Sequence, residues 1–404
     1  MASEASPDYC FPSRLADQRI LLSVIRLNSR DGLAHYLLGN WLYDRRRRTE
    51  AIHHWELARR KGFVYSVLYR NLAIGYHNIS RRPDKALAAY QAAQRAAPSD
   101  ARLMYETDQL KRRLCVPVKQ RLACLVAHQE LVGQRHDLTI EFCALLNLAG
   151  RHQEALGILE TRLFQPWEGG EGKVLEQYIL AHLSLGKQYL HGGHFTPAQR
   201  HFTAALHPPE TLGEAAHPLA NKSQVYYYLG LAYAHGDIPE SRRWLQLAAS
   251  PAGDFQDMAV REYSALTLYR ALALQALKRP APARRLLLDL QAYAGRLEHS
   301  PAEIDYFATS LAAMGLFGSN LKMEQKTTAL FLRAQAAFGL GRAATTKSLL
   351  MQVLRRDPAH CPAAELLKLI RSGFGSATVA SAAAAHRRVT RARAAAEHKR
   401  SKTR

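Results

Sequence analysis

The feature that most constrains the fold of this chain is a side-chain pattern that returns about every 34 residues. Its first two occurrences consist of Leu38, Gly39, Ala51, Trp55 and Ala58, and of Leu72, Ala73, Ala86, Tyr90 and Ala93. A small residue on one helix lets a second helix approach closely, and a bulky residue on the second helix fills the space between the two. The spacing therefore predicts consecutive pairs of helices, each pair packed on the next.

The same spacing recurs further along the chain. Gly186 precedes Phe202, Gly230 precedes Leu245, and Ala271 precedes Leu287 by similar intervals. No run of alternating polar and apolar residues indicates a β-strand. A period of about 34 residues is the tetratricopeptide period, and the prediction is an all-α protein, a right-handed α-solenoid of tetratricopeptide-type helix pairs.

The departures from the pattern predict how the chain is divided. Residues 1–30 are expected to form an N-terminal capping helix, 31–98 two clean tetratricopeptide repeats, and 99–165 divergent helix pairs. Residues 166–370 are expected to hold further repeats, interrupted by long inserts at 164–173, 208–222 and 250–257. Residues 371–404 form a basic, Ala-rich tail, which such a composition predicts to be disordered or else a weak Ala-rich helix.

Composition narrows the function classes. The formal net charge is +21, and the tail contributes nine basic residues against one acid, Glu397. The five cysteines include no C-x-x-C pair, and no signal peptide or uncharged apolar run long enough to cross a membrane is present, so a cytoplasmic protein is expected. His182, His191, His194 and His201 lack a metal-binding motif and are expected to face solvent or cap helices. Neither a cofactor nor a catalytic arrangement is predicted.

Polar and aromatic side chains on the first helix of each pair are candidates for the inner face of the solenoid. This groove is predicted to contain Tyr36, Asn40, Tyr43, Arg70, Asn71, His77, Arg102, Tyr227 and Tyr228. Tyrosine suits peptide recognition because it offers a rigid apolar ring with one polar tip, although Tyr227 and Tyr228 could instead pack the superhelix. Asn40, Asn71 and Arg102 also resemble a carboxylate clamp, but Glu106 at the last clamp position would repel a carboxylate.

A glycine-rich loop contains the most distinctive polar cluster. It consists of Trp167, Glu168, Glu171 and Lys173, separated by glycines at 169, 170 and 172. Glycine allows backbone conformations that bring a loop close to a ligand, so the cluster is a candidate contact for a ligand or a partner domain. The alternative is a connection between repeats whose glycines serve only its turn.

Five stretches give the chain a family resemblance. They are Tyr-Leu-Leu-Gly-Asn at 36–40, Arg-Asn-Leu-Ala-Ile-Gly-Tyr at 70–76, Pro-Trp-Glu-Gly-Gly-Glu-Gly-Lys-Val-Leu at 166–175, Leu-Gly-Glu at 212–214 and Ile-Asp-Tyr-Phe-Ala at 304–308. Over residues 12–365 the chain resembles the tetratricopeptide region of large bacterial proteins that begin with a mutarotase-like β-sandwich domain of unknown function. The resemblance implies a link to carbohydrates, but this sequence contains no counterpart of the β-domain.

Three hypotheses for function follow. The first is a non-catalytic protein-interaction scaffold that presents a tetratricopeptide groove to a peptide or partner protein. The second, implied by the resemblance alone, is a detached accessory region of a carbohydrate-related mutarotase-like enzyme system. The third is a nucleic-acid-associated scaffold, in which the basic residues of 387–404 contact phosphates without sequence readout, since no aromatic residues are interleaved.

Overall fold

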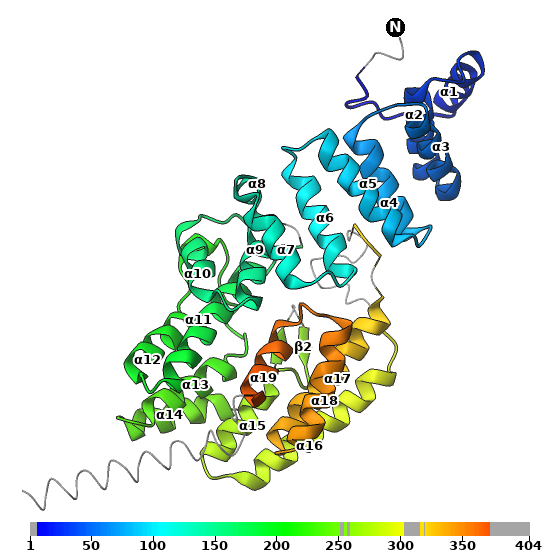
Figure 1. The fold of residues 1–404 in the computed structure, drawn as a ribbon. Helices are drawn as coiled ribbons and strands as arrows, with labels where there is room; N and C mark the ends of the chain where they lie inside the picture. The colour runs from blue at the N-terminus through cyan, green and yellow to red at the C-terminus, as the bar shows by residue number, and fades with distance from the viewer. Residues whose placement is uncertain are drawn as a thin grey trace, which may run out of the picture. The chain divides into compact units, whose positions relative to one another are not determined.

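The computed structural model describes residues 6–167, 169–250, 254–256, 259–302, 316–318 and 320–371. These residues divide into two compact units, which are described separately (Figure 1). Unit 1 comprises the described residues among 1–116, 123–138 and 314–319. Unit 2 comprises those among 117–122, 139–313 and 320–404. The predicted tail, residues 371–404, lies outside the described residues except for Arg371.

Unit 1 is built of short helices in sequence order. They are α1 (Leu15–Leu27), α2 (Gly32–Asp44), α3 (Arg48–Arg60), α4 (Ser66–Asn78), α5 (Pro83–Ala96), α6 (Ala101–Arg113) and α8 (Gln129–Gln134). Helices α2 and α3 pack as one pair and α4 and α5 as the next, as the repeat predicts. Helices α7 (Val118–Val126) and α9 (His136–Leu148) each contain a boundary between the units.

Unit 2 continues the arrangement with longer helices. They are α10 (His152–Thr161), α11 (Lys173–His191), α12 (Phe195–Ala204), α13 (Ser223–Tyr233), α14 (Ile238–Ala249), α15 (Thr267–Ala276), α16 (Pro280–His299), α17 (Leu321–Gly339), α18 (Ala343–Arg356) and α19 (Cys361–Arg371). Each odd-numbered helix from α11 to α17 packs against the even-numbered helix that follows it. The described part of the chain is therefore an all-α solenoid of helix pairs with one exception, given below.

The predicted small-to-bulky contacts are confirmed. A Cβ atom added at Gly39 would overlap the Trp55 ring, and one at Gly186 would overlap Phe202. At Gly230 the added Cβ would lie 2.6 Å from Leu245 Cγ. These glycines therefore allow the two helices of a pair to approach closely, and the bulky residue of the second helix fills the contact.

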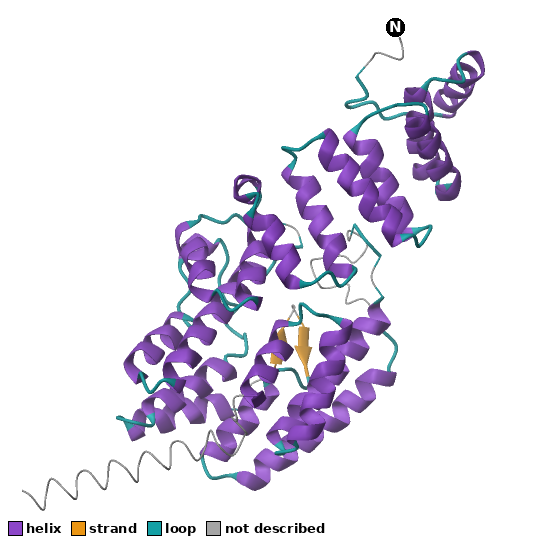
Figure 2. Ribbon diagram, viewed as in Figure 1, coloured by secondary structure: helices purple, strands orange, loops and turns teal. Residues whose placement is uncertain are grey.

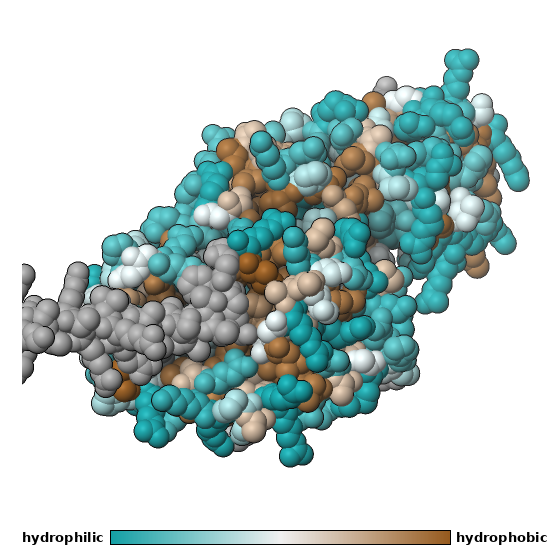
Figure 3. Space-filling model, turned by 60° about the horizontal axis from the view of Figure 1, so that its bottom comes forward, coloured by the Kyte–Doolittle hydropathy of each residue, from teal (hydrophilic) through white to brown (hydrophobic). Residues whose placement is uncertain are grey.

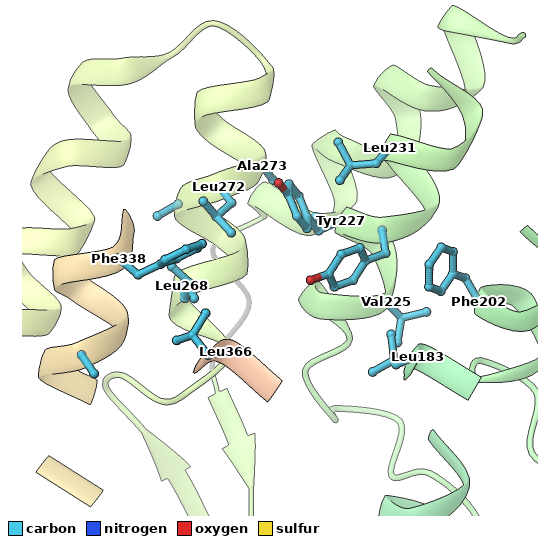
Figure 4. Packing of buried hydrophobic residues seen from close by; sticks show 14 of the residues in the cluster. Leu183, Phe202, Val225, Tyr227, Leu231, Leu268, Leu272, Ala273, Phe338 and Leu366 are labelled. Carbon is cyan, nitrogen blue, oxygen red and sulfur yellow. The ribbon is translucent and has the colours of Figure 1, made fainter. Parts of the chain in front are cut away.

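The core of unit 2 joins successive pairs into one apolar layer. Figure 4 shows side chains of α11, α12, α13, α15, α17 and α19 packed together, among them Leu183, Phe202, Tyr227, Leu268 and Leu366. Unit 1 has a separate cluster, centred on Trp41, Trp55, Leu72 and Tyr90. Each unit thus buries its own apolar residues, as stacked repeats require.

The expectation that the chain contains no strand is wrong at one place. Strands β1 (Asp254–Gln256) and β2 (Ala259–Arg261) form an antiparallel hairpin, in which Phe255 pairs with Val260 (Figure 2). The hairpin begins inside the predicted insert at 250–257. Strands of three residues are too short to show the alternation by which longer strands are recognised in a sequence.

Figure 3 shows one face of the molecule, on which apolar side chains lie between a larger number of polar ones. Within the described ranges, none of the helices has both the length and the apolar character needed to cross a membrane.

Candidate functional site

The candidate site is a hollow in unit 2 with a volume of about 1030 Å³. Its walls come from α11, α13, α15, α17 and α19, together with the loop that precedes α11. Helices α11, α13, α15 and α17 are the first helices of successive pairs, the helices from which the sequence analysis drew its candidate groove residues.

The walls combine apolar side chains with charged ones, and the positive and negative charges are nearly balanced in number. Leu183, Val225 and Phe331 supply apolar surface. Four lysines and three glutamates also line the hollow, namely Lys173, Lys187, Lys222, Lys368, Glu171, Glu176 and Glu365. The net charge of +21 is therefore not concentrated here, and the hollow suits a ligand with both apolar and charged groups.

A half-buried ion pair in the wall of the hollow joins α11 to α19. The ammonium of Lys187 and the hydroxyl of Ser184 both donate hydrogen bonds to the carboxylate of Glu365. Burial alone would lower the pKa of Lys187 and raise that of Glu365, but their mutual attraction reverses both shifts, so both stay charged. The pair fixes α19 against α11. No sequence motif could reveal it, because the partners are 178 residues apart.

The glycine-rich loop forms one end of the hollow. Trp167 packs on Gly170, where an added Cβ would overlap the indole ring. Glu171 and Lys173 line the hollow, and the Lys173 ammonium donates a hydrogen bond to the carbonyl of Gly169. Glu168 lies outside the described residues. Two of the four predicted loop residues therefore face the hollow, and Trp167 supports the loop.

A residue missed by the site prediction, Glu214, holds the start of α11. Its carboxylate accepts hydrogen bonds from the backbone N–H groups of Gly172 and Leu175, both at 2.7 Å. A carboxylate at a helix N-terminus satisfies donors that have no partner within the helix. The backbone of Phe164 also bonds to Thr211 at 2.8 Å, so the stretches 166–175 and 212–214 lie together. The only sequence signal for this was their joint presence in the family resemblance.

In unit 1 the predicted asparagines bind each other. Asn40 Oδ1 accepts from Trp55 Nε1 at 3.0 Å and from Asn71 Nδ2 at 3.2 Å. This arrangement links the inner helices α2 and α4 to the bulky residue of α3. Both asparagines are half-buried.

The predicted cations of unit 1 are held by Glu106. Arg70 donates two hydrogen bonds to its carboxylate, at 2.6 and 2.8 Å, and Arg102 donates one at 2.9 Å. Tyr90 also donates to Glu106, at 3.1 Å, and burial together with that carboxylate raises the pKa of Tyr90 far above its usual range. The negative charge of Glu106 is therefore compensated by Arg70 and Arg102, and the Arg102 side chain remains 57% exposed.

The predicted tyrosines occupy different environments. Tyr36 is buried against Phe63 and Tyr65, and Tyr227 is buried against Tyr228 and Tyr269. Tyr43 packs on Trp55 and remains half-buried. Tyr228 alone of these lines the hollow. The remaining predicted groove residue, His77, contacts Phe317.

The histidines do not form a metal site in the described part of the chain, where no group of three or more metal-binding side chains occurs. The expectation that these histidines face solvent or cap helices is wrong for His182. It is buried, and its Nδ1 lies 3.0 Å from Nδ1 of His201.

No protein-family model matches the chain. Solved structures with similar folds include YrrB, described as a TPR protein with an unusual peptide-binding site, with 18% identity, 48% of this chain and 96% of that chain covered, and a TM-score of 0.35. The structure of Naa15/Naa10 bound to HypK-THB has 13% sequence identity and a TM-score of 0.40, and the match covers 91% of this chain and 60% of that chain. The apo form of the quorum sensor NprR from B. thuringiensis has 14% sequence identity and a TM-score of 0.27, and the match covers 84% of this chain and 80% of that chain. None of these similarities assigns a residue or a partner to this chain.

Proposed function

We propose that this chain is a non-catalytic protein-interaction scaffold whose unit 2 binds a peptide or an extended segment of a partner protein. The observation that carries the proposal is the hollow of about 1030 Å³, which is lined by the first helices of four successive pairs. Its volume is at the upper end of the range for ligand pockets, of the order of 300–1,000 Å³, and suits several residues of a peptide.

The chemistry of the walls supports a peptide over a polyanion. Apolar surface from Leu183 and Phe331 lies beside lysines and glutamates in similar numbers. A nucleic acid would favour a wall of one sign, since its affinity comes mainly from phosphate contacts. The exposed charges Lys173, at the start of α11, and Lys368, in α19, both line the hollow and would contact acidic groups of the peptide.

The test is selection of linear peptides from a random phage library against the full chain, followed by affinity measurements. Reversing two charges of the hollow, in the double variant Lys173→Glu with Lys368→Glu, is expected to weaken the selected peptides about tenfold, which corresponds to about 1.4 kcal/mol. The matched control reverses Arg284 and Lys347 to Glu, because both are exposed in unit 2 outside the hollow. Equal losses in the two variants would place binding elsewhere, and a failure to select any peptide would refute the proposal.

A further inference from the structure

A short segment that belongs to no helix, Leu316–Gly318, is packed against α4, α5 and α6 of unit 1. Its central side chain, Phe317, is only 2% exposed, and Leu316 is half-buried against the same core. The contacts span more than 200 residues of sequence. Neither the repeat pattern nor the hollow of unit 2 accounts for this segment.

The Phe317 ring lies among three side chains of different helices. The ring of His77, on α4, is 5.1 Å away and nearly perpendicular at 79°. The ring of Tyr90, on α5, is 6.1 Å away at 68°. The guanidinium of Arg113, on α6, lies over the ring at 5.8 Å. Edge-to-face packing and a cation over the ring face both favour an aromatic side chain over an aliphatic one of similar size.

The backbone on either side of Phe317 is bound by a single amide. Asn78 Nδ2 donates to the carbonyl of Leu316 at 3.0 Å, and Asn78 Oδ1 accepts from the N–H of Gly318 at 3.0 Å. Arg113 adds a longer hydrogen bond to the carbonyl of Gly318, at 3.4 Å. An amide that bonds the carbonyl before a residue and the N–H after it recognises main chain, whatever the flanking side chains are.

The site does not depend on the glycine that follows Phe317. A Cβ atom added at Gly318 would have Asn78 Oδ1 as its nearest neighbour, at 3.9 Å, which is ordinary contact. The site therefore recognises one aromatic side chain and the main chain on both sides of it. Backbone hydrogen bonds combined with a pocket for one side chain are the general means by which proteins bind peptide segments.

We propose that His77, Asn78, Tyr90 and Arg113 form a second peptide-binding site, which takes a peptide with a central aromatic residue. The chain's own Leu316–Gly318 occupies this site, and a partner's peptide of the same chemistry binds by displacing it. The site is independent of the proposed hollow, since all its residues belong to unit 1 and the hollow belongs to unit 2. Failure of either proposal therefore leaves the other intact.

The first experiment uses a labelled peptide with the sequence of residues 313–321 and the full chain, with binding followed by fluorescence anisotropy. The variant Phe317→Ala empties the pocket, so it is expected to bind the peptide about tenfold more tightly than the unmodified chain, in which the tethered segment competes at an effective concentration of the order of 1 mM. Phe317→Leu, which keeps apolar packing but loses the ring contacts, should give a smaller gain. Circular dichroism checks that both variants fold.

Changes to the peptide and to Asn78 test the chemistry. In the Phe317→Ala background, Asn78→Leu should abolish binding, whereas Gln91→Leu, at an exposed position of α5, should leave it unchanged. A peptide with alanine in place of its phenylalanine should not bind. Replacing the peptide residue that corresponds to Gly318 by sarcosine removes the N–H that donates to Asn78 Oδ1. This change should weaken binding about twofold to tenfold.

Photo-crosslinking locates the peptide in the unmodified chain. A peptide that carries p-benzoylphenylalanine at its centre, supplied in excess, should cross-link within residues 77–113, and excess unlabelled peptide should suppress the cross-link. Cross-links mainly elsewhere would overturn the proposal. So would equal affinity of Phe317→Ala and the unmodified chain, or binding that is indifferent to the peptide's phenylalanine, because the segment would then be ordinary core packing.

Discussion

Two histidine pairs occupy equivalent places in different repeats. Each first histidine stands four residues before the small residue of its helix, His35 before Gly39 and His182 before Gly186. The Nδ1 atoms of His35 and His54 lie 3.0 Å apart, and so do those of His182 and His201. Each arrangement requires one ring to donate a hydrogen bond and the other to accept it. Burial, together with the paired histidine, lowers the pKa of His35 and of His182 to about 4.

The pairs predict a loss of stability in mild acid. The unfolded chain binds protons at these rings near pH 6.5, whereas the folded chain does so only near pH 4, so the stabilisation is complete above pH 6.5 and is lost as the pH falls towards 4. Between pH 7 and pH 5, each of the two rings, His35 and His182, should lower the free energy of unfolding by roughly 2 kcal/mol. For His35, Lys61 acts in the same direction and Asp31 opposes it.

The measurement is the urea midpoint at pH 7 and pH 5, a window above the range in which carboxylates titrate. The double variant His35→Gln with His182→Gln, whose amides hydrogen-bond but do not titrate, should show a shallower decline than the unmodified chain. An identical decline in both proteins, or ring signals of His35 and His182 that titrate near pH 6.5 in NMR spectra, would contradict the argument.

Residues that act within one repeat could be predicted from the sequence, and residues that act between distant segments could not. The contacts of Gly39 with Trp55 and of Gly186 with Phe202 follow from spacing, because a helix pair fixes which positions face each other. The contact of Phe317 with His77 crosses about 240 residues, and nothing local to either residue indicates it.

At the scale of elements, the turns within helix pairs share one hydrogen-bond pattern. The first N–H after the turn bonds to the carbonyl five residues earlier in five pairs, for example from Arg47 to Leu42 at 2.9 Å and from Arg342 to Ala337 at 2.8 Å. The residue before that N–H is left-handed, with φ near +60° at Arg46 and Lys278 and +77° at Gly341. This is the helix-ending motif that glycine normally completes.

Two of these turns therefore store removable strain. Replacing Arg46 or Lys278, both exposed, by glycine is expected to raise the free energy of unfolding by about 0.5–1 kcal/mol each, since a left-handed conformation costs a non-glycine residue about 1–2 kcal/mol and glycine loses part of that gain in entropy. The urea midpoint measures the change. Gln91→Gly, at an exposed position in the middle of α5, is the matched control and should lower stability by about 1 kcal/mol.

The sequence predicts an element when the element repeats and misses it when it occurs once. Helices α2 and α3 illustrate the first case, because their pairing follows the repeat. The turn at residues 81–83 contains one residue more, and its Arg82 N–H bonds to the carbonyl of Tyr76, six residues earlier. The hairpin of β1 and β2 illustrates the second, since it occurs in no other insert of the described chain. The contact of α19 with α11 through Glu365 and Lys187 likewise does not belong to the repeat pattern.

At the scale of the whole molecule, each unit has its own apolar core and its own pair of tryptophans. Trp41 and Trp55 belong to the core of unit 1, while Trp167 and Trp244 belong to unit 2. In stacked-repeat proteins stability is a sum of local terms, so damage to one repeat need not spread through the chain. Equivalent glycine contacts in the two units allow this expectation to be tested with matched substitutions.

Gly39→Ala and Gly186→Ala are expected to destabilise different parts of the chain. Each substitution forces a Cβ atom into an aromatic ring, Trp55 in unit 1 or Phe202 in unit 2, at a cost of about 1–3 kcal/mol. Hydrogen exchange followed by mass spectrometry should show Gly39→Ala reducing amide protection in α2 to α5, and Gly186→Ala reducing it in α11 to α15. Each variant serves as the control for the other. If either one lowered protection by the same amount in both sets of helices, the two cores would form a single cooperative structure, and the division into independently stabilised units would be wrong.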